Sequence, residues 1–457
     1  MESTRRDFLK QSTATMLTAA GVGAIGKEIF APTYVYGARN LPERDSGPTL
    51  VVIYLRGGSD PLSVFVPFDD RTYYQMRPTI SILPNDALHI NNRTFRLNPA
   101  MAPLLPMINA GEIAPIINVG SPNDTRSHFD AQDFMERAAP GIKSISEGWL
   151  NRYLEQTKTQ TDPELRALAI QPLLPRSLRG QYPVLAAPAR KSNRHERAMA
   201  VFEELYGCDE DRKMHRAAKA AEMQADTRRP GRRKKSRKEP EPPPIDEAAQ
   251  RQRIVSAGSN TIRRLRELRR IIEESPDTHV QYPPDLGEKL QAVAKVIRAN
   301  VGLEIAAVDY GNWDHHIRQG GSGGVMAPML ANLSKSIAAF YKDLGNRRHM
   351  VCTLVMSEFG RTVKENGNRG SDHGRGGYML VIGEMVNGNR MYGRWTGLDV
   401  ANLADGRDLP VYTDFRLVFA EVLVKLFGYD PPDARAVNDM FPGWNNRGRS
   451  LGLLKQL

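Results

Sequence analysis

Short apolar runs rich in β-branched residues alternate with longer segments of helical spacing over most of this chain. Five of the short runs predict strands, at residues 50–55, 113–119, 303–308, 351–356 and 378–382. The run 351–356 has no polar alternation, which is typical of a strand buried on both faces of a parallel sheet. We therefore expect a sheet that lies in the interior and is covered by helices.

Four segments have the apolar spacing of an α-helix, at residues 262–274, 286–300, 326–344 and 415–427. Asp414 is a suitable N-cap for the last of these, and Gly428 is a suitable stop after it. Strands separated by helices predict βαβ units. The expected fold class is α/β, a three-layer α/β/α sandwich with a mainly parallel sheet.

The length of 457 residues allows one large domain with an insertion. We expect residues 39–206 to form the first part of an α/β domain and residues 251–457 to complete it. Residues 207–250 between them are predicted to be a basic, proline-rich, disordered insertion, because such a composition cannot bury enough apolar surface to fold alone.

The basic character of the chain is local. Residues 212–238 hold twelve Lys or Arg against Glu222 and Asp226, so this tract carries +10 of the formal net charge of +11. It is either a solvated segment or a tether to an anionic surface. No aromatic side chains interleave with the basic ones, so no specific nucleic-acid partner is expected. Two cysteines, Cys208 and Cys352, make neither a disulfide framework nor a thiolate metal site.

The amino terminus has the pattern of an export signal. Residues 3–10, STRRDFLK, closely match the twin-arginine signal, and a mildly apolar stretch follows at residues 14–25. That stretch is too short and too mild to span a membrane; the alternative is an ordinary amphipathic terminal helix. We expect residues 1–38 to be a removable signal read by the twin-arginine export machinery. The mature protein, without a transmembrane segment, is then periplasmic or extracellular.

Polar clusters directly follow four of the predicted strands. They are RGGSD at 56–60, GSPNDTRSHFDAQD at 120–133, DYGNWDHH at 309–316, and SEFGR with SDHGRGG at 357–361 and 371–377. Loops at the carboxyl ends of parallel strands converge at one edge of a sheet, where ligands bind. Carboxylates, imidazoles and a hydroxyl are the parts of a metal-hydrolase centre. Taken singly, each of these residues is equally at home as a hydrogen-bonded loop residue.

The chain resembles the proteins that share the domain of unknown function 1501. The resemblance rests on the twin-arginine start and on LVVIYLRGGSDPLSVFVPFDD, GSPNDTRSHFDAQD, GWLNRYL, NWDHH, VMSEFGRTVKENG, SDHGRGG and YGRWTGL, which span nearly the whole mature chain. That family is similar in fold to the alkaline phosphatase and sulfatase superfamily. The resemblance therefore implies a large exported α/β domain of alkaline-phosphatase-like architecture with a divalent-metal site.

Carried over to this sequence, the resemblance implies a set of metal ligands and a nucleophile. The implied ligands are Asp60, Asp314, His316, Glu358 and His373, with Asp309 as an alternative carboxylate. The implied nucleophile is Ser127, with Thr125 as its alternative. Phe359 stands where the superfamily has a histidine ligand, so either Asp372 or His128 compensates, one ion suffices, or the site is degenerate.

The donor types predict one tightly held divalent ion. Two imidazoles and a carboxylate form a common three-ligand arrangement with an open position, and they suit zinc or manganese. The residues expected to hold the ion are Asp314, His316 and His373. Those expected to face it across the cleft are Asp60, Ser127 and Glu358.

These assignments imply a metal-dependent hydrolase of sulfate or phosphate esters. Ser127 would attack sulfur or phosphorus, and Arg126 or Arg361 would neutralise the developing anion. The substrate would be a small-molecule or polysaccharide ester. The competing hypothesis is a non-catalytic binding or scaffold protein that keeps the fold, and Phe359 is the residue that favours it.

The export signal can be tested on its two arginines. The receptor for this signal tolerates little change in the pair, so changing both Arg5 and Arg6 to lysine should leave the protein in the cytoplasm. Cell fractionation followed by immunodetection measures the outcome. Normal export of the double variant would contradict the assignment.

Overall fold

The computed structural model describes residues 47–190, 247–429, 434–444 and 449–455. These residues fall into two compact units. The larger holds residues 47–190 and 268–455 and carries the sheet, and the smaller holds residues 247–267, the first part of helix α9 (Glu247–Glu274). The predicted signal, residues 1–38, lies outside the described residues, and so does the predicted insertion as far as residue 246.

Eight strands form one mixed sheet in the order β10-β4-β9-β8-β1-β7-β5-β6. Strand β9 runs antiparallel to both neighbours, and every other neighbouring pair is parallel. In chain order the strands are β1 (Thr49–Leu55), β4 (Ile113–Gly120), β5 (Ala167–Ile170), β6 (Leu185–Ala187), β7 (Ile305–Tyr310), β8 (Val351–Met356), β9 (Gly377–Ile382) and β10 (Thr413–Asp414). The protein therefore has an α/β fold with a mainly parallel sheet.

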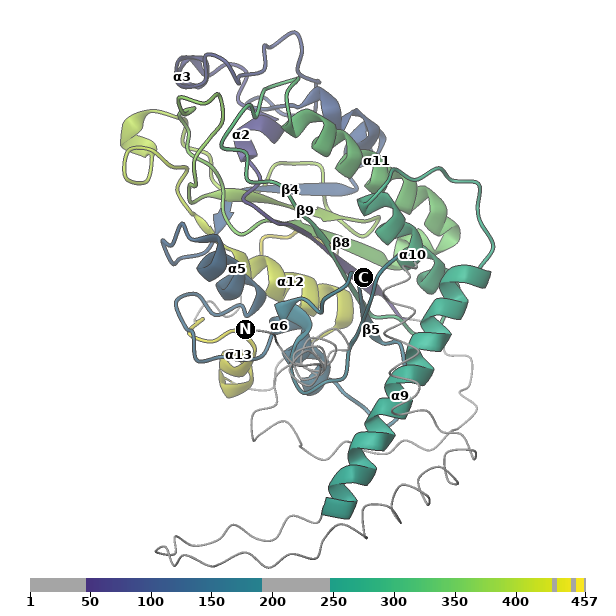
Figure 1. Cartoon of the computed structure of the whole chain (residues 1–457). Helices are drawn as coiled ribbons and strands as arrows, with labels where there is room; N and C mark the ends of the chain where they lie inside the picture. Colours follow the sequence, from purple (N-terminus) through teal and green to yellow (C-terminus); the bar gives the residue numbers. More distant parts are fainter. Residues whose placement is uncertain (1–46, 191–246, 430–433, 445–448, 456–457) are drawn as a thin grey trace, which may run out of the picture. The chain divides into compact units, whose positions relative to one another are not determined.

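Helices cover both faces of the sheet (Figure 1). One face carries α10 (Leu286–Arg298) and α11 (Met326–Leu344); the other carries α5 (His128–Glu136), α6 (Trp149–Gln156), α12 (Phe415–Phe427) and α13 (Ala434–Met440). On this second face, alternate residues of the strands, such as Leu50 and Val52, join the helices in one apolar core. There Trp149 stacks on Phe419 with ring centroids 4.2 Å apart.

The remaining elements are short. They are α2 (Pro61–Val64), α3 (Arg71–Met76), α4 (Leu105–Asn109), a two-stranded antiparallel sheet of β2 (Phe65–Val66) and β3 (Arg96–Leu97), and 3₁₀ helices at Pro99–Leu104, Arg176–Leu178, Gly345–Met350 and Val400–Asn402. Within the described ranges, no helix combines the length and the apolar composition that crossing a bilayer requires.

The register of the central strands brings their loops to one level. Leu55 of β1 pairs with Tyr310 of β7, and Tyr54 pairs with Met356 of β8, so the three strands end side by side. Antiparallel β9 begins where β4 ends, because Gly377 pairs with Val119. The loops after β1, β4 and β7 and the loop that joins β8 to β9 therefore meet at one edge of the sheet.

Most of the predicted elements form at the predicted positions. The β8, α11 and α12 segments coincide with the predictions, and Asp414 caps α12 while Gly428 ends it at a φ of +64°. Strand β7 is shifted by two residues, because Asp309 and Tyr310 continue the pairing with β1. The short strands β5, β6 and β10 and the early start of α9 at Glu247 are not predicted from the sequence.

Candidate metal centre

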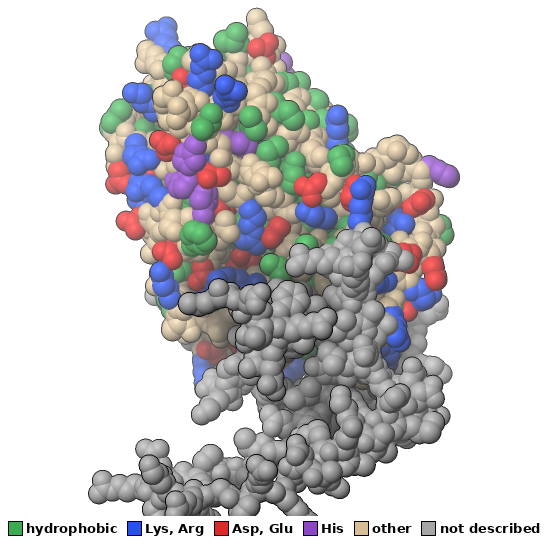
Figure 2. Space-filling view, viewed as in Figure 1, with side chains coloured by type: hydrophobic (Ala, Val, Ile, Leu, Met, Phe, Trp, Pro, Cys, Tyr) green, Lys and Arg blue, Asp and Glu red, His purple; other side chains and the backbone are tan. Residues whose placement is uncertain are grey.

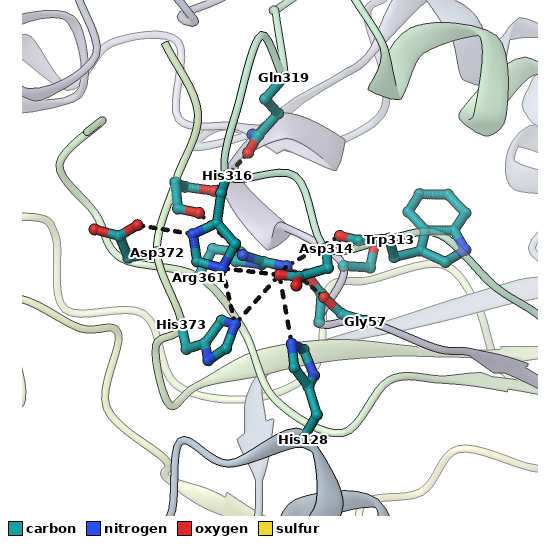
Figure 3. Close-up of polar contacts among 12 residues, drawn as sticks. Gly57, His128, Trp313, Asp314, His316, Gln319, Arg361, Asp372 and His373 are labelled. Atoms are coloured by element: carbon teal, nitrogen blue, oxygen red, sulfur yellow. Dashed lines mark hydrogen bonds and ion pairs between the residues drawn. The ribbon is translucent and has the colours of Figure 1, made fainter. Parts of the chain in front are cut away.

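Three histidine side chains converge on one carboxylate oxygen at this edge (Figure 3). The Oδ1 atom of Asp314 lies 3.0 Å from Nε2 of His316, 3.2 Å from Nε2 of His373 and 3.4 Å from Nε2 of His128. Asp314 and His316 lie in the loop after β7, His373 lies just before β9, and His128 begins α5. The cluster is partly exposed, and Figure 2 shows histidines gathered in one surface patch beside basic and acidic side chains.

The ring nitrogen of His128 that points away from the cluster is held by a buried carboxylate. Nδ1 of His128 lies 2.8 Å from Oε1 of Glu358, whose side chain is fully buried. The same oxygen accepts from the backbone N–H of Gly57 at 2.9 Å and from Nε2 of Gln132 at 2.8 Å. Burial alone would raise the pKa of Glu358, but the hydrogen bonds from His128 and Gln132 lower it below its ordinary value, so this carboxylate is ionised.

The other two histidines are also held through Nδ1. His316 contacts Oδ1 of Asp372 at 2.9 Å, and His373 contacts the carbonyl oxygen of Arg126 at 2.8 Å. A carbonyl oxygen can only accept, so Nδ1 of His373 carries the hydrogen. Burial and the positive charges nearby lower the pKa of His373, which keeps this ring neutral and leaves Nε2 with a lone pair.

The Nε2 atoms of His316 and His373 face each other. They are 3.0 Å apart, which fits a hydrogen bond in which one nitrogen carries the hydrogen, and also fits two ligands of one metal ion. Nε2 of His128 is buried and has no hydrogen-bond partner in the structure. Buried polar atoms of this kind are rarely left without a partner, and a metal ion would supply one to all three rings at once.

The donor set fits a divalent metal ion. Ligand atoms about 2.0–2.1 Å from an ion lie roughly 2.9–3.4 Å from their neighbours in octahedral or tetrahedral geometry, and the separations from Asp314 Oδ1 to the three imidazoles are 3.0, 3.2 and 3.4 Å. One ligand atom each from His128, Asp314 and His373 lies within 4.8 Å of the others. Nitrogen and oxygen donors of this kind suit zinc or manganese.

Asp314 is held in place by the buried side chain of Arg361. Nη2 of Arg361 lies 2.6 Å from Oδ1 of Asp314 and 3.1 Å from the carbonyl oxygen of Trp313. Its Nε donates to the carbonyl of Gly58 at 2.7 Å, and its Nη1 donates to that of Ser371 at 2.9 Å. Burial alone would raise the pKa of Asp314. The hydrogen bond and charge of Arg361, together with the neighbouring histidines, outweigh burial and lower this pKa to about 2.

Phe359 forms an apolar wall beside the cluster. Its ring lies 4.8 Å from that of His128 and 5.1 Å from that of His373, between centroids. Gly58, at a φ of +74°, leaves the room for this ring, because a Cβ atom there would lie 2.7 Å from Phe359 Cε2. Phe359 thus packs against the sides of two imidazole rings, and it has no atom that could bind a metal ion.

Residues 113–441 match the family described as protein of unknown function (DUF1501). The chain belongs to the DUF1501 family. Searches of curated proteins and of solved structures found no match. The span shared with DUF1501 contains all four residues of the cluster and Glu358, whereas Asp60 precedes it.

Among the ligands expected from the sequence, Asp314, His316 and His373 lie together in the structure. His128, which the sequence left as one of two compensating residues, supplies the additional imidazole, while Asp372 stands behind His316. Glu358, another of the implied ligands, lies behind His128, and its Oε1 atom contacts His128, Gln132 and Gly57.

Asp60, a further implied ligand, has structural partners. It is buried and makes a two-pronged ion pair with Arg77, which is itself fully buried. Oδ2 of Asp60 further accepts from Ser63 and Gln319, both at 2.6 Å. Burial raises the pKa of Asp60, but Arg77 lowers it below its ordinary value. Its oxygens are thus occupied by partners that hold the loop after β1.

Asp309, the alternative carboxylate, is paired as well. It lies inside β7, where Oδ1 is 3.0 Å from Nη2 of Arg56 and Oδ2 accepts from Gln171 at 3.2 Å.

The two candidate arginines make other contacts than the sequence implied. The guanidinium of Arg126 is paired with Asp405 and Asp408, with Nη2 2.6 Å from each. Arg361 is buried against backbone carbonyls and Asp314, so it is neither a surface ion pair nor free to meet a substrate. Ser127 is exposed at the N-cap of α5, directly before His128, and its side chain makes no capping hydrogen bond.

The residues of α5 that hold Glu358 have a recognisable spacing in the sequence, which the family resemblance does not include. His128, Gln132 and Glu136 are four residues apart, so they share one face of the helix. The first two bind Glu358, and Glu136 lies 2.7 Å from Nη1 of Arg56. Polar residues at this spacing on a helix that packs against a sheet edge indicate a buried polar network.

The structural role of Asp60 gives a test. Changing Asp60 to Asn should lower the free energy of unfolding by about 3–5 kcal/mol, because Arg77 stays buried without its counter-charge. Denaturant titration measures this, and Asp69→Asn on the exposed surface is the control, expected within about 0.5 kcal/mol of wild type. Metal content of the folded protein should not change. Loss of metal at unchanged stability would return Asp60 to the metal centre.

Proposed function

We propose that this DUF1501 protein is an exported hydrolase that holds one divalent transition-metal ion between His128, Asp314, His316 and His373. The observation that carries the proposal is the convergence of three imidazole Nε2 atoms on Asp314 Oδ1 at 3.0–3.4 Å. Each imidazole is turned toward this point by an acceptor on its Nδ1 atom. Such support behind the ligands is usual in protein metal sites.

One ion is proposed rather than two. The residue at the second position of the superfamily pattern is Phe359, which is buried and packs against two of the histidines. Glu358, beside it, has its Oε1 atom occupied by three donors. Among the described residues, one group of at least three acidic, histidine or cysteine side chains is close enough to hold an ion: His128, Asp314 and His373, with His316 adjoining the last two.

The proposed substrate is a phosphate or sulfate ester, as the resemblance to alkaline phosphatases and sulfatases implies. A divalent ion in this position supplies a Lewis acid for an ester oxygen. Ser127 is the proposed nucleophile, since its exposed hydroxyl directly precedes His128 at the amino end of α5. The Nε2 atoms of His128, His316 and His373 face the centre, and the ring of Phe359 packs against one side of it.

The amino-terminal segment and the basic insertion lie outside the candidate site. Residues 1–38 are proposed to direct export by the twin-arginine machinery to the periplasm or beyond. This machinery carries folded proteins, so the metal could be loaded before export. Residues 207–246 are proposed to be a solvated insertion with no role in the metal centre; residues 247–250, predicted to belong to it, begin helix α9 instead.

Metal content tests the centre directly. Purified wild-type protein should hold one equivalent of zinc or manganese by elemental analysis, and His316→Ala should lose it, because one of the imidazoles is removed. His349→Ala is the matched control: this exposed histidine bonds the carbonyl of Asn346 within its own turn, and its loss should leave the metal in place. Equal metal content in all three proteins would contradict the proposal.

The catalytic part of the proposal is tested on Ser127. With a chromogenic phosphate or sulfate monoester, Ser127→Ala should lower kcat on the order of 10³-fold or more at unchanged metal content. Thr125→Ala, two residues away, should retain most of the activity. An unchanged rate in Ser127→Ala would exclude this residue as nucleophile. A metal-loaded wild type without any turnover would favour the non-catalytic binding protein instead.

A further inference from the structure

We infer that Glu358 is a positioning residue: it turns His128 toward the metal centre and strengthens this imidazole as a ligand. The inference deepens the proposed function and rests on the proposed metal at the histidine cluster. Glu358 then orients a ligand and does not bind the metal itself, although the family resemblance implies that it is a ligand.

The hydrogen-bond geometry fixes which nitrogen of His128 is free. Oε1 of Glu358 accepts from two groups that can only donate, the N–H of Gly57 at 2.9 Å and the amide of Gln132 at 2.8 Å. The third partner of this oxygen, Nδ1 of His128 at 2.8 Å, must therefore donate as well. Nε2 of His128 is left to face Asp314, and it is the buried nitrogen without a hydrogen-bond partner.

Glu358 differs from the acceptors behind the other two histidines. The carboxylate side chain of Asp372, behind His316, is 51% exposed, whereas that of Glu358 is 0% exposed. The acceptor behind His373 is a neutral carbonyl. A buried negative charge is screened less by solvent than an exposed one, so it polarises its imidazole more strongly. His128 should therefore be the most electron-rich of the three imidazoles.

Glu358 is itself fixed from several sides. Ser357 Oγ contacts its Oε2 atom at 3.1 Å. Gln132, which donates to Oε1, accepts in turn from Nη1 of Arg56 at 3.2 Å, and Arg56 is paired with Glu136. The carboxylate thus has little freedom to turn toward the metal itself. The chain of contacts leads from the loop after β8 through α5 to the loop after β1.

The test compares metal affinity among carboxylate variants. Dissociation constants for Zn²⁺ are measured by competition with a chromophoric chelator, and the visible spectrum of Co²⁺ bound in place of zinc reports the donors. Glu358→Gln should weaken Zn²⁺ binding about 10- to 100-fold and alter the Co²⁺ spectrum. Asp372→Asn should weaken binding less. Glu112→Gln, whose carboxylate pairs with Arg348 at the opposite end of β4, should match wild type.

A second variant separates positioning from folding. Gln132→Ala keeps the Glu358 carboxylate and removes one of its donors, so it should weaken Zn²⁺ binding by less than Glu358→Gln does. It decides the matter if Glu358→Gln fails to fold, as judged by the thermal unfolding of metal-free protein. Wild-type affinity in both variants would overturn the inference.

Two further outcomes are distinct. If wild type binds no Zn²⁺ in this titration, the proposed function fails before Glu358 is tested. If Glu358→Gln keeps full affinity and an unchanged Co²⁺ spectrum but loses hydrolytic rate, then Glu358 acts on a histidine that is not a ligand. That result would also overturn the inference.

Discussion

The buried guanidinium of Arg361 is the contact on which the candidate site depends. A charge in the interior is tolerated when hydrogen-bond acceptors surround it, and here the acceptors are backbone carbonyls of three separate loops together with Asp314. One side chain thereby ties the loops after β1 and β7 to the loop before β9. It also turns the Asp314 carboxylate toward the histidines. Removing it would take one donor from each of five acceptors, the carbonyls of Gly57, Gly58, Trp313 and Ser371 and the carboxylate of Asp314, and would loosen the ligand loops together.

A network of buried and half-buried polar side chains lies behind the histidines, on the side away from the candidate metal position. The network runs from Glu358 through Gln132 to Arg56, and Arg56 pairs with Glu136 and Asp309. A polar network inside a protein is stabilising when every member finds a partner, and it holds its members in one arrangement. Phe359 packs against the histidines on their apolar side. The imidazoles are thus fixed by hydrogen bonds at one end and by packing at the side.

Much of the framework could be predicted from the sequence, because β8, α11 and α12 carry strong period and capping signals. The meeting of Asp314, His316 and His373 could also be predicted, since they flank strand ends at one edge of a parallel sheet. Whether a carboxylate faces the metal centre or stands behind a ligand could not be predicted, because side-chain positions that differ by a few ångströms decide it. Asp60 and Glu358 both follow strands, yet Arg77 occupies the first and His128 the second. Such pairings join residues far apart in sequence, and no local pattern records them.

The central claim, that three imidazoles and one carboxylate share a metal ion, is tested most directly by X-ray absorption at the metal edge of the purified protein. The account predicts three nitrogen donors with the multiple scattering of imidazole rings and at least one oxygen donor, all at about 2.0–2.2 Å. A spectrum with one imidazole or none, from a protein that is folded and loaded with metal, would contradict the account.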